Sequence, residues 1–216
     1  LAQLTIAGEI DVNSRLRIGL LAAALGFSSS SPAAELDPNK HFDPQGKPPS
    51  EHTLKVIRED SADLPFSDRR DFAEAEKGFI AEPESWKVFG PAGNVVWDLQ
   101  RYDFFRSDTD FPSVHPSLQR ISRLNMKVGL FEVKPGFYQV RGFDLANMTF
   151  VETDSGWVVF DPLTAPETSA KAKQLVDKHL GERPVVGVVY SHSHVDHWGG
   201  VRGIVDEADV RAGKVT

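Results

Sequence analysis

The chain has 216 residues, of which 40% are hydrophobic and 10% are aromatic, and its formal net charge is −7. This composition supplies enough apolar side chains for a packed core and excludes a largely disordered chain. The acidic balance, without a basic stripe, argues against a nucleic-acid partner. Because the sequence contains no cysteine, disulfide bonds and thiolate metal sites are excluded, and any metal ion must be held by imidazole and carboxylate groups.

Residues 1–34 have the pattern of a secretory signal. Two arginines precede an apolar run at 18–27, and small residues suited to cleavage follow at 28–34. The run is shorter than the roughly 20 apolar residues that a membrane span needs, so we expect no stable span. A buried or disordered N-terminal helix is the alternative interpretation. We therefore expect a periplasmic or secreted protein, with an extended proline-rich linker over 35–49.

Residues 50–128 are predicted to form an extension of helices and one hairpin. Ser50 and Ser67 can each cap a helix, and a third helix is expected near 117–127. Apolar spacing suggests that the second of these helices continues towards Phe79. Two short apolar stretches flank a glycine-rich turn between the second and third helices, which predicts the hairpin.

From residue 129 the pattern changes to strands separated by turns, followed by a β-α-β unit. Strands are predicted at 130–133, 137–141, 148–152, 157–161 and 185–190, with a helix at 166–180 whose residues Ala170, Ala172, Leu175, Val176 and His179 lie along it. The valine-rich run at 185–190 is typical of a strand covered on both faces. Hairpins that lead into a β-α-β unit predict a mixed α/β layered domain over 129–216.

Potential metal ligands are concentrated directly after the last predicted strand. They are His192, His194, Asp196 and His197. If the chain stays extended, the first two imidazoles point to the same side. Imidazole and carboxylate suit zinc, and also iron, manganese or nickel. Since one ion rarely takes four ligands from so short a loop, we expect two adjacent ions, the first two histidines facing one and the Asp–His pair the other, with an activated water as nucleophile.

Other candidate residues carry weaker signals. Asp161 ends a strand next to the motif strand and could orient a ligand histidine through a hydrogen bond, although a turn role at the strand end is the alternative. Trp198 is expected to pack at the rim of the site. The remaining histidines are isolated and are interpreted as surface or capping residues: His41, His52, His115 and His179.

The run at 191–200 resembles the signature of the metallo-β-lactamase superfamily, which covers lactonases, thioesterases, glyoxalase-type enzymes and phosphodiesterases. Segments outside the motif are more specific, because they resemble the linear alkylsulfatases at near-constant spacing from about residue 50 onwards. These segments are 64–72, 78–81, 96–99, 129–133, 136–149 and 161–163.

This resemblance implies an αββα fold with two zinc ions that hydrolyses alkyl sulfate esters, such as dodecyl sulfate, to an alcohol and inorganic sulfate. By this likeness His192 and His194 would bind the first zinc, and Asp196 and His197 the second. It also implies detergent degradation and a homodimer formed through a region outside this chain. Another superfamily hydrolase, acting on lactones, thioesters or phosphoesters, and an inactive metal-binding fragment are the alternatives.

The resemblance also implies that the family pattern continues beyond residue 216. We therefore expect the chain to be the N-terminal piece of a longer enzyme, with an incomplete αββα sandwich after the helical and hairpin extension. Four ligands cannot satisfy two zinc ions that each take about four, so further ligands are expected elsewhere in the whole enzyme.

Overall fold

The structure, a computed structural model, describes residues 48–107 and 109–216. These residues all belong to the second of the two units into which the chain divides, Phe42–Thr216. The expected secretory signal, His41 and nearly all of the expected linker lie outside the described residues. None of the described helices has the length and apolar character that a membrane span requires.

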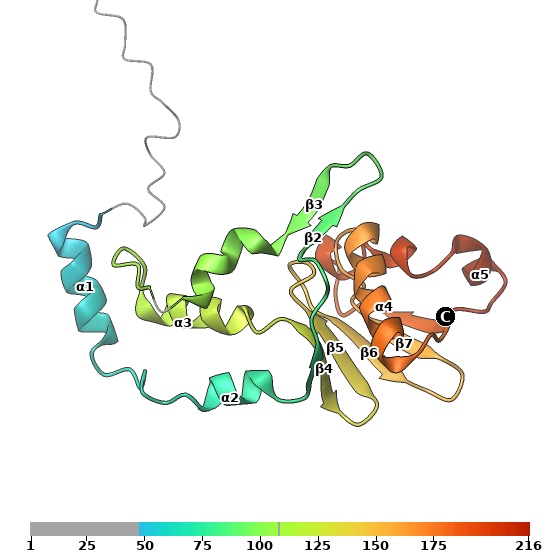
Figure 1. The fold of residues 1–216 in the computed structure, drawn as a ribbon, viewed down its shortest axis with the longest axis horizontal. Coiled ribbons are helices and arrows are strands. Elements are labelled where there is room, and N and C mark those ends of the chain that lie inside the picture. Colours follow the sequence, from blue (N-terminus) through green and yellow to red (C-terminus); the bar gives the residue numbers. More distant parts are fainter. Residues whose placement is uncertain (1–47, 108) are drawn as a thin grey trace, which may run out of the picture. The chain divides into compact units, whose positions relative to one another are not determined.

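Short helices and a hairpin make up the first part of the described chain (Figure 1). The elements are α1 (Glu51–Ser61), α2 (Arg70–Glu76), β1 (Phe79–Ala81), β2 (Lys87–Phe89), β3 (Val95–Asp98), the 3-10 helix η2 (Leu99–Arg106) and α3 (Pro116–Asn125). The hairpin is confirmed as an antiparallel two-stranded sheet of β2 and β3. The segment η2 was not predicted from the sequence.

The predicted caps of the first two helices have different outcomes. Ser50 caps α1 as predicted, since its hydroxyl accepts a hydrogen bond of 3.1 Å from Thr53 N. The prediction for Ser67 is wrong, because α2 begins only at Arg70. A turn in which Asp68 N donates to Pro65 O precedes the helix, and the Asp68 carboxylate accepts from Arg70 N at 3.0 Å.

The second helix also ends earlier than its apolar spacing suggested. Gly78 has φ +68, and a Cβ there would lie 1.9 Å from Glu132 O. This close approach lets Glu132 N donate to Gly78 O at 2.7 Å. Phe79 therefore belongs to β1, which pairs antiparallel with β4. Pairing with the sheet overrides the local helical pattern here.

The main sheet has six strands in the order β1-β4-β5-β6-β7-β8. Its further strands are β4 (Gly129–Lys134), β5 (Phe137–Arg141), β6 (Met148–Glu152), β7 (Trp157–Phe160) and β8 (Val185–Val189). All pairs are antiparallel except β7 and β8, which are parallel and joined by α4 (Pro166–Leu180). The predicted β-α-β unit is thereby confirmed.

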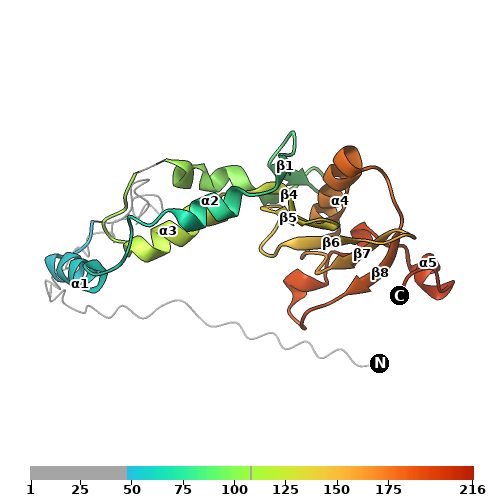
Figure 2. The same cartoon turned by 90° about the horizontal axis from the view of Figure 1, so that it is seen from below.

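The core lies between one face of this sheet and α4 (Figure 1 and Figure 2). It includes Leu130, Val140, Met148, Phe150, Trp157 and Val159 from the sheet, and Ala172, Leu175 and Val176 from α4. The buried stripe of α4 begins with Thr168 and Ser169, whereas His179 is exposed. His179 therefore lies on the solvent side of the helix.

The described residues do not cover β8 on both faces, so the prediction of such cover stays a prediction. This strand lies at the edge of the sheet, Val186 and Val188 are only partly buried, and Val189 is 40% exposed. Its outer edge exchanges backbone hydrogen bonds with Thr216, whose N donates to Val186 O and whose O accepts from Val188 N.

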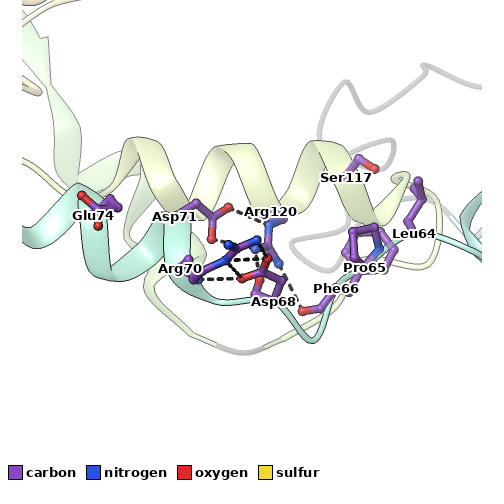
Figure 3. A pocket seen from close by; sticks show the side chains of 9 residues that line it. All are labelled: Leu64, Pro65, Phe66, Asp68, Arg70, Asp71, Glu74, Ser117 and Arg120. Carbon is purple, nitrogen blue, oxygen red and sulfur yellow. Dashed lines mark hydrogen bonds and ion pairs between the residues drawn. The ribbon is translucent and has the colours of Figure 1, made fainter.

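A polar cluster around Arg120 joins α3 to α2 and the turn before it (Figure 3). The guanidinium donates to both Asp71 carboxylate oxygens at 2.9 and 2.6 Å, to Phe66 O at 3.2 Å and to Asp68 O. This cluster borders a pocket of about 580 Å³, whose lining contains no histidine.

Candidate metal centre

The sheet brings Asp161 and the histidine motif together. Because β7 and β8 are parallel, their carboxyl ends lie at the same edge, with Phe160 paired to Val189. One residue further on, Asp161 N donates to Val189 O at 3.0 Å. The loop that starts with Asp161 and the loop that starts with Tyr190 therefore leave the sheet side by side, which is a usual position for sites in α/β folds.

The motif is bent, whereas an extended chain would have been needed for the two-residue spacing to align His192 and His194. Residues 191–193 form bends, and the 3-10 helix η3 (Val195–His197) follows. The imidazoles nevertheless approach one another: the ring centroid of His192 lies 4.7 Å from that of His194 and 4.0 Å from that of His197. The bend therefore gathers three imidazoles, where the extended strand would have aligned two.

Asp161 holds the beginning and the end of the motif at once. Its Oδ1 accepts from Ser191 N at 2.8 Å, its Oδ2 accepts from Ser191 Oγ at 2.8 Å, and the same Oδ2 lies 2.9 Å from His197 Nδ1. Burial raises the pKa of the Asp161 carboxyl, but the hydrogen bonds from Ser191 and His197 outweigh it and hold this pKa below its ordinary value.

These contacts leave a defined ring nitrogen of His197 for a ligand. With Nδ1 directed at Asp161, Nε2 is the other ring nitrogen, and it lies 3.3 Å from Asp196 Oδ2. Ser191 Oγ also lies 2.9 Å from His192 Nδ1. A carboxylate on one ring nitrogen fixes the tautomer and makes the opposite nitrogen a better metal ligand.

Two glycines allow the motif to pack on the turn after β7. A Cβ at Gly200 would lie 2.1 Å from Pro162 O, and one at Gly199 would lie 2.4 Å from Thr164 O. Gly200 N donates to Leu163 O at 2.8 Å. Only glycine permits this approach of two backbones.

The donor types fit a divalent cation, since imidazole and carboxylate groups meet without any thiolate. Asp196 and His197 are half-buried, while His192 and His194 are exposed. Among residues 48–107 and 109–216, no group of three or more acidic, histidine or cysteine side chains is arranged so that it could hold a metal ion. The described residues thus supply ligand types and an oriented imidazole, and the roles predicted for the four ligands remain predictions.

The isolated histidines lie apart from this arrangement, whereas Trp198 contacts the motif. His115 caps α3, its Nδ1 accepting from Ser117 N at 3.2 Å, which confirms the capping interpretation. His52 and His179 are exposed on α1 and α4. Trp198 is 44% exposed, and its indole donates to Ser193 O at 3.0 Å.

Ser191 and Asp144 also belong to this region, although no role was predicted for either of them. Ser191 bridges Asp161 and His192, and its position between strand and first histidine was the only available signal. Asp144 is a buried acid that accepts hydrogen bonds from the turn after β7. Apart from the adjacent Leu145 N, its partners are 20 and 24 residues away in the sequence, so no local pattern marks it.

Comparison with known proteins assigns the chain to a family. A family model described as the metallo-beta-lactamase superfamily matches residues 141–216. The chain is 46% identical over 197 residues to a linear primary-alkylsulfatase of Pseudomonas sp., covering 91% of this chain and 28% of that protein. It is 50% identical over 169 residues to an (R)-specific secondary-alkylsulfatase of Pseudomonas sp., covering 78% of this chain and 25% of that protein. The chain belongs to the alkylsulfatase family of the metallo-β-lactamase superfamily.

A solved alkylsulfatase structure agrees with this assignment. The stereoselective inverting sec-alkylsulfatase of Pseudomonas sp. superposes with a TM-score of 0.72 at 50% identity, covering 79% of this chain and 27% of that chain. The predicted alkylsulfatase resemblance and the predicted metallo-β-lactamase-like α/β fold are confirmed. Membership of this superfamily implies a metal cofactor.

The match to the alkylsulfatases covers only part of each relative. An alkyl/aryl-sulfatase of Saccharomyces cerevisiae is 44% identical over 163 residues, covering 76% of this chain and 25% of that protein. The chain thus spans about a quarter of the length of the curated relatives that it matches. The boundaries predicted at residues 34, 49 and 128 stay predictions.

Proposed function

We propose that this chain is part of an enzyme that hydrolyses alkyl sulfate esters, such as dodecyl sulfate, to an alcohol and inorganic sulfate. The observation that carries the proposal is the identity of 44% to 50% with three proteins named as alkylsulfatases. This identity extends over 76% to 91% of the chain, well outside the histidine motif that many superfamily hydrolases share. The motif alone would leave lactones, thioesters and phosphoesters open.

We propose zinc as the cofactor, with two ions in the whole enzyme. His192 and His194 would hold one ion, and Asp196 and His197 the other. When bound, such a pair supplies Lewis acidity that activates water near neutral pH and offsets the negative charge of a sulfate ester. Asp161 keeps the Nε2 atom of His197 available by accepting at Nδ1, and Ser191 does the equivalent at Nδ1 of His192.

The surface next to the motif suits an amphiphilic substrate. Val195 and Trp198 lie within or next to the histidine motif and are 51% and 44% exposed. Together they offer apolar surface beside the groups that would hold the charged sulfate head.

The test measures zinc content and sulfate release from dodecyl sulfate for the wild-type chain and for His197→Ala and His192→Ala. His179→Ala is the matched control, because it removes an exposed histidine on α4 outside the motif. We expect zinc binding that both motif variants lose and the control keeps. Because further ligands are expected elsewhere in the whole enzyme, sulfate release should appear only when the rest of the enzyme is supplied. It should then follow zinc content, with a simple lactone and a phosphodiester left intact. Opening of the lactone without sulfate release would contradict the proposal in favour of another superfamily hydrolase.

A chimera extends this test to a complete enzyme. In it the chain replaces the matching quarter of the Pseudomonas (R)-specific secondary-alkylsulfatase, of which it covers 25%. We expect the chimera to hydrolyse a secondary alkyl sulfate and its His197→Ala variant to be inactive. A folded chimera that binds zinc but releases no sulfate would contradict the proposal.

We also propose that the protein is exported and that the whole enzyme is a homodimer. The apolar run at 18–27, followed by small residues, supports export. A fusion of residues 1–40 to a reporter that is active only outside the cytoplasm tests it, and activity retained after replacing two leucines of the run with arginine would contradict it. The homodimer is proposed from the family resemblance alone. Analytical ultracentrifugation of the whole enzyme tests it, and a monomer would contradict it.

A further inference from the structure

Asp144 is a buried carboxylate in the loop between β5 and β6, 9% exposed, and the site described above does not include it. Its Oδ1 accepts from Leu145 N and Thr164 Oγ1, both at 2.7 Å. Its Oδ2 accepts from Thr164 N at 3.1 Å and Thr168 Oγ1 at 2.7 Å. All four donors are uncharged, and each lone pair of the buried carboxylate is used, as burial of a charge requires.

Three of these four donors come from the segment that follows β7. Thr164 belongs to the turn at 161–165, and Thr168 lies in the first turn of α4. Two residues of this turn, Asp161 and Leu163, have positive φ values of 55° and 60°. Residues other than glycine keep such conformations only where the surrounding structure holds them. Asp144 binds the backbone directly after the second of these residues.

The same turn contacts the histidine motif at two separate points. At its start, the Asp161 carboxylate accepts from Ser191 and lies 2.9 Å from His197 Nδ1. Near its middle, Leu163 O accepts from Gly200 N at 2.8 Å. A displacement of the turn would therefore move the partner of His197 and the support of the motif together.

We infer that Asp144 is a positioning residue, which fixes the turn at 161–165 and thereby holds Asp161 against His197. No hydrogen bond or ion pair links Asp144 to a motif histidine among the described residues, so it acts only through the turn. The inference rests on the proposed function in one respect, that the oriented Nε2 atom of His197 serves as a metal ligand.

Asp144→Asn is the informative variant. It preserves size, but one carboxylate oxygen becomes an NH₂ group, and in the present orientation that group would face the N–H of Thr164, a donor against a donor. Asp161→Gly is the reference, because it removes the carboxylate that meets His197 while glycine accepts the positive φ. Thr153→Ala is the matched control, since it removes a hydroxyl that holds the β6–β7 turn through Gly156 O at 2.7 Å, near the opposite edge of the sheet.

The first measurement is the tautomer of His197 in the metal-free chain, from long-range ¹H–¹⁵N spectra recorded well below the unfolding temperature. We expect the proton on Nδ1 in the wild type and in Thr153→Ala. Asp144→Asn should shift the population towards the Nε2–H form, as Asp161→Gly does. A folded Asp144→Asn chain with the wild-type tautomer of His197 would overturn the inference.

The second measurement is zinc affinity by competition with a chelating dye. Asp144→Asn should weaken binding by about 10- to 100-fold, the usual effect of removing a group that orients a metal ligand. In the Asp161→Gly background the same substitution should add almost nothing, since both act through one contact. If the two substitutions weaken zinc binding independently, so that their fold-changes multiply in the double variant, the inference would be overturned. Failure of the wild type to bind zinc would count against the proposed function, while the tautomer comparison would still decide the role of Asp144.

If Asp144→Asn does not fold, Thr168→Val provides the same test in milder form. It removes one of the four hydrogen bonds to the carboxylate, from a buried hydroxyl of α4. A smaller shift of the His197 tautomer in the same direction supports the inference, and an unchanged tautomer contradicts it.

Discussion

The helical segments before residue 128 and the sheet after it are held together by different interactions. In the described part of the chain, neither α1 nor α2 contains a buried residue, and α3 buries only Gln119, whose amide bonds to Phe111 and Val114. The sheet buries Leu130, Phe150 and Val159 completely. Helices α1 to α3 therefore bury no apolar side chain, whereas the sheet is held by apolar packing, so substitutions should affect them in different ways.

The largest effect is expected in the core of the sheet. Phe150→Ala removes a ring with 0% exposure between the sheet and α4, and should lower the free energy of unfolding by about 3–5 kcal/mol. The matched change Leu54→Ala in α1 affects a half-exposed side chain and should cost less than about 1 kcal/mol. Denaturant titrations of both variants provide the comparison. Equal losses would refute the contrast between the two parts.

A glycine in each part gives the next comparison. Gly200→Ala places a Cβ 2.1 Å from Pro162 O, and the backbone shift should cost about 1–3 kcal/mol and weaken zinc binding. Gly93→Ala meets no atom within 4 Å, and its φ of +77° should cost about 1–2 kcal/mol while zinc affinity stays unchanged. Calorimetric titration with zinc distinguishes them. Wild-type zinc affinity in Gly200→Ala would show that the packing of the motif on the turn is unimportant.

The polar cluster around Arg120 should be important only locally. Arg120→Ala removes hydrogen bonds to Asp71, Phe66 O and Asp68 O. Amide hydrogen exchange at residues 66–72 should accelerate by about an order of magnitude, while exchange in β6 stays as in the wild type. Arg202→Ala is the control, because Arg202 is an exposed arginine paired with Glu207. Faster exchange in β6 would mean that the two parts unfold together.

The smallest effect is a pH dependence from Asp71. The hydrogen bond from Arg120 lowers the pKa of the Asp71 carboxyl in the folded chain. The ionised group therefore contributes stability above the ordinary carboxyl pKa of about 4, and this contribution disappears as the pH falls through the lowered value. The stability difference between wild type and Asp71→Asn should be constant near neutral pH and shrink below about pH 4. Because Asp71 is 39% exposed, solvent screens the pair. If the stability difference between wild type and Asp71→Asn does not change with pH, it does not come from the ionised Asp71 carboxylate.

The second part of the chain was also the more predictable one. Strands at 137–141 and 148–152 and the helix at 166–180 agree with the structure to the residue. Alternating apolar residues, glycine turns and the stop at Gly181 are local signals, and local signals suffice where the core is apolar. By contrast, β1 exists because Gly78 approaches Glu132, a contact that periodicity does not contain.

In the candidate site too, local features could be predicted and contacts between distant residues could not. The ligand-type residues of the motif could be recognised because they are neighbours in sequence. The groups that orient them could be recognised only in part: Asp161 through its position at a strand end, and Asp144 not at all. The contacts of Asp161 with Ser191 and of Asp144 with Thr164 span 30 and 20 residues. Only the register of β7 against β8 brings the first pair together.

The backbone of Asp161 sets a limit on which amino acids its position accepts. At φ 55° the chain tolerates glycine, asparagine and aspartate far better than any other residue. A library at this position that is screened for folding alone would therefore retain all three. Only a screen that requires an ionised partner for His197 would retain aspartate by itself. Comparing the two screens at position 161 thus separates the requirement of the fold, a residue that accepts positive φ, from the requirement of the site, a carboxylate beside His197.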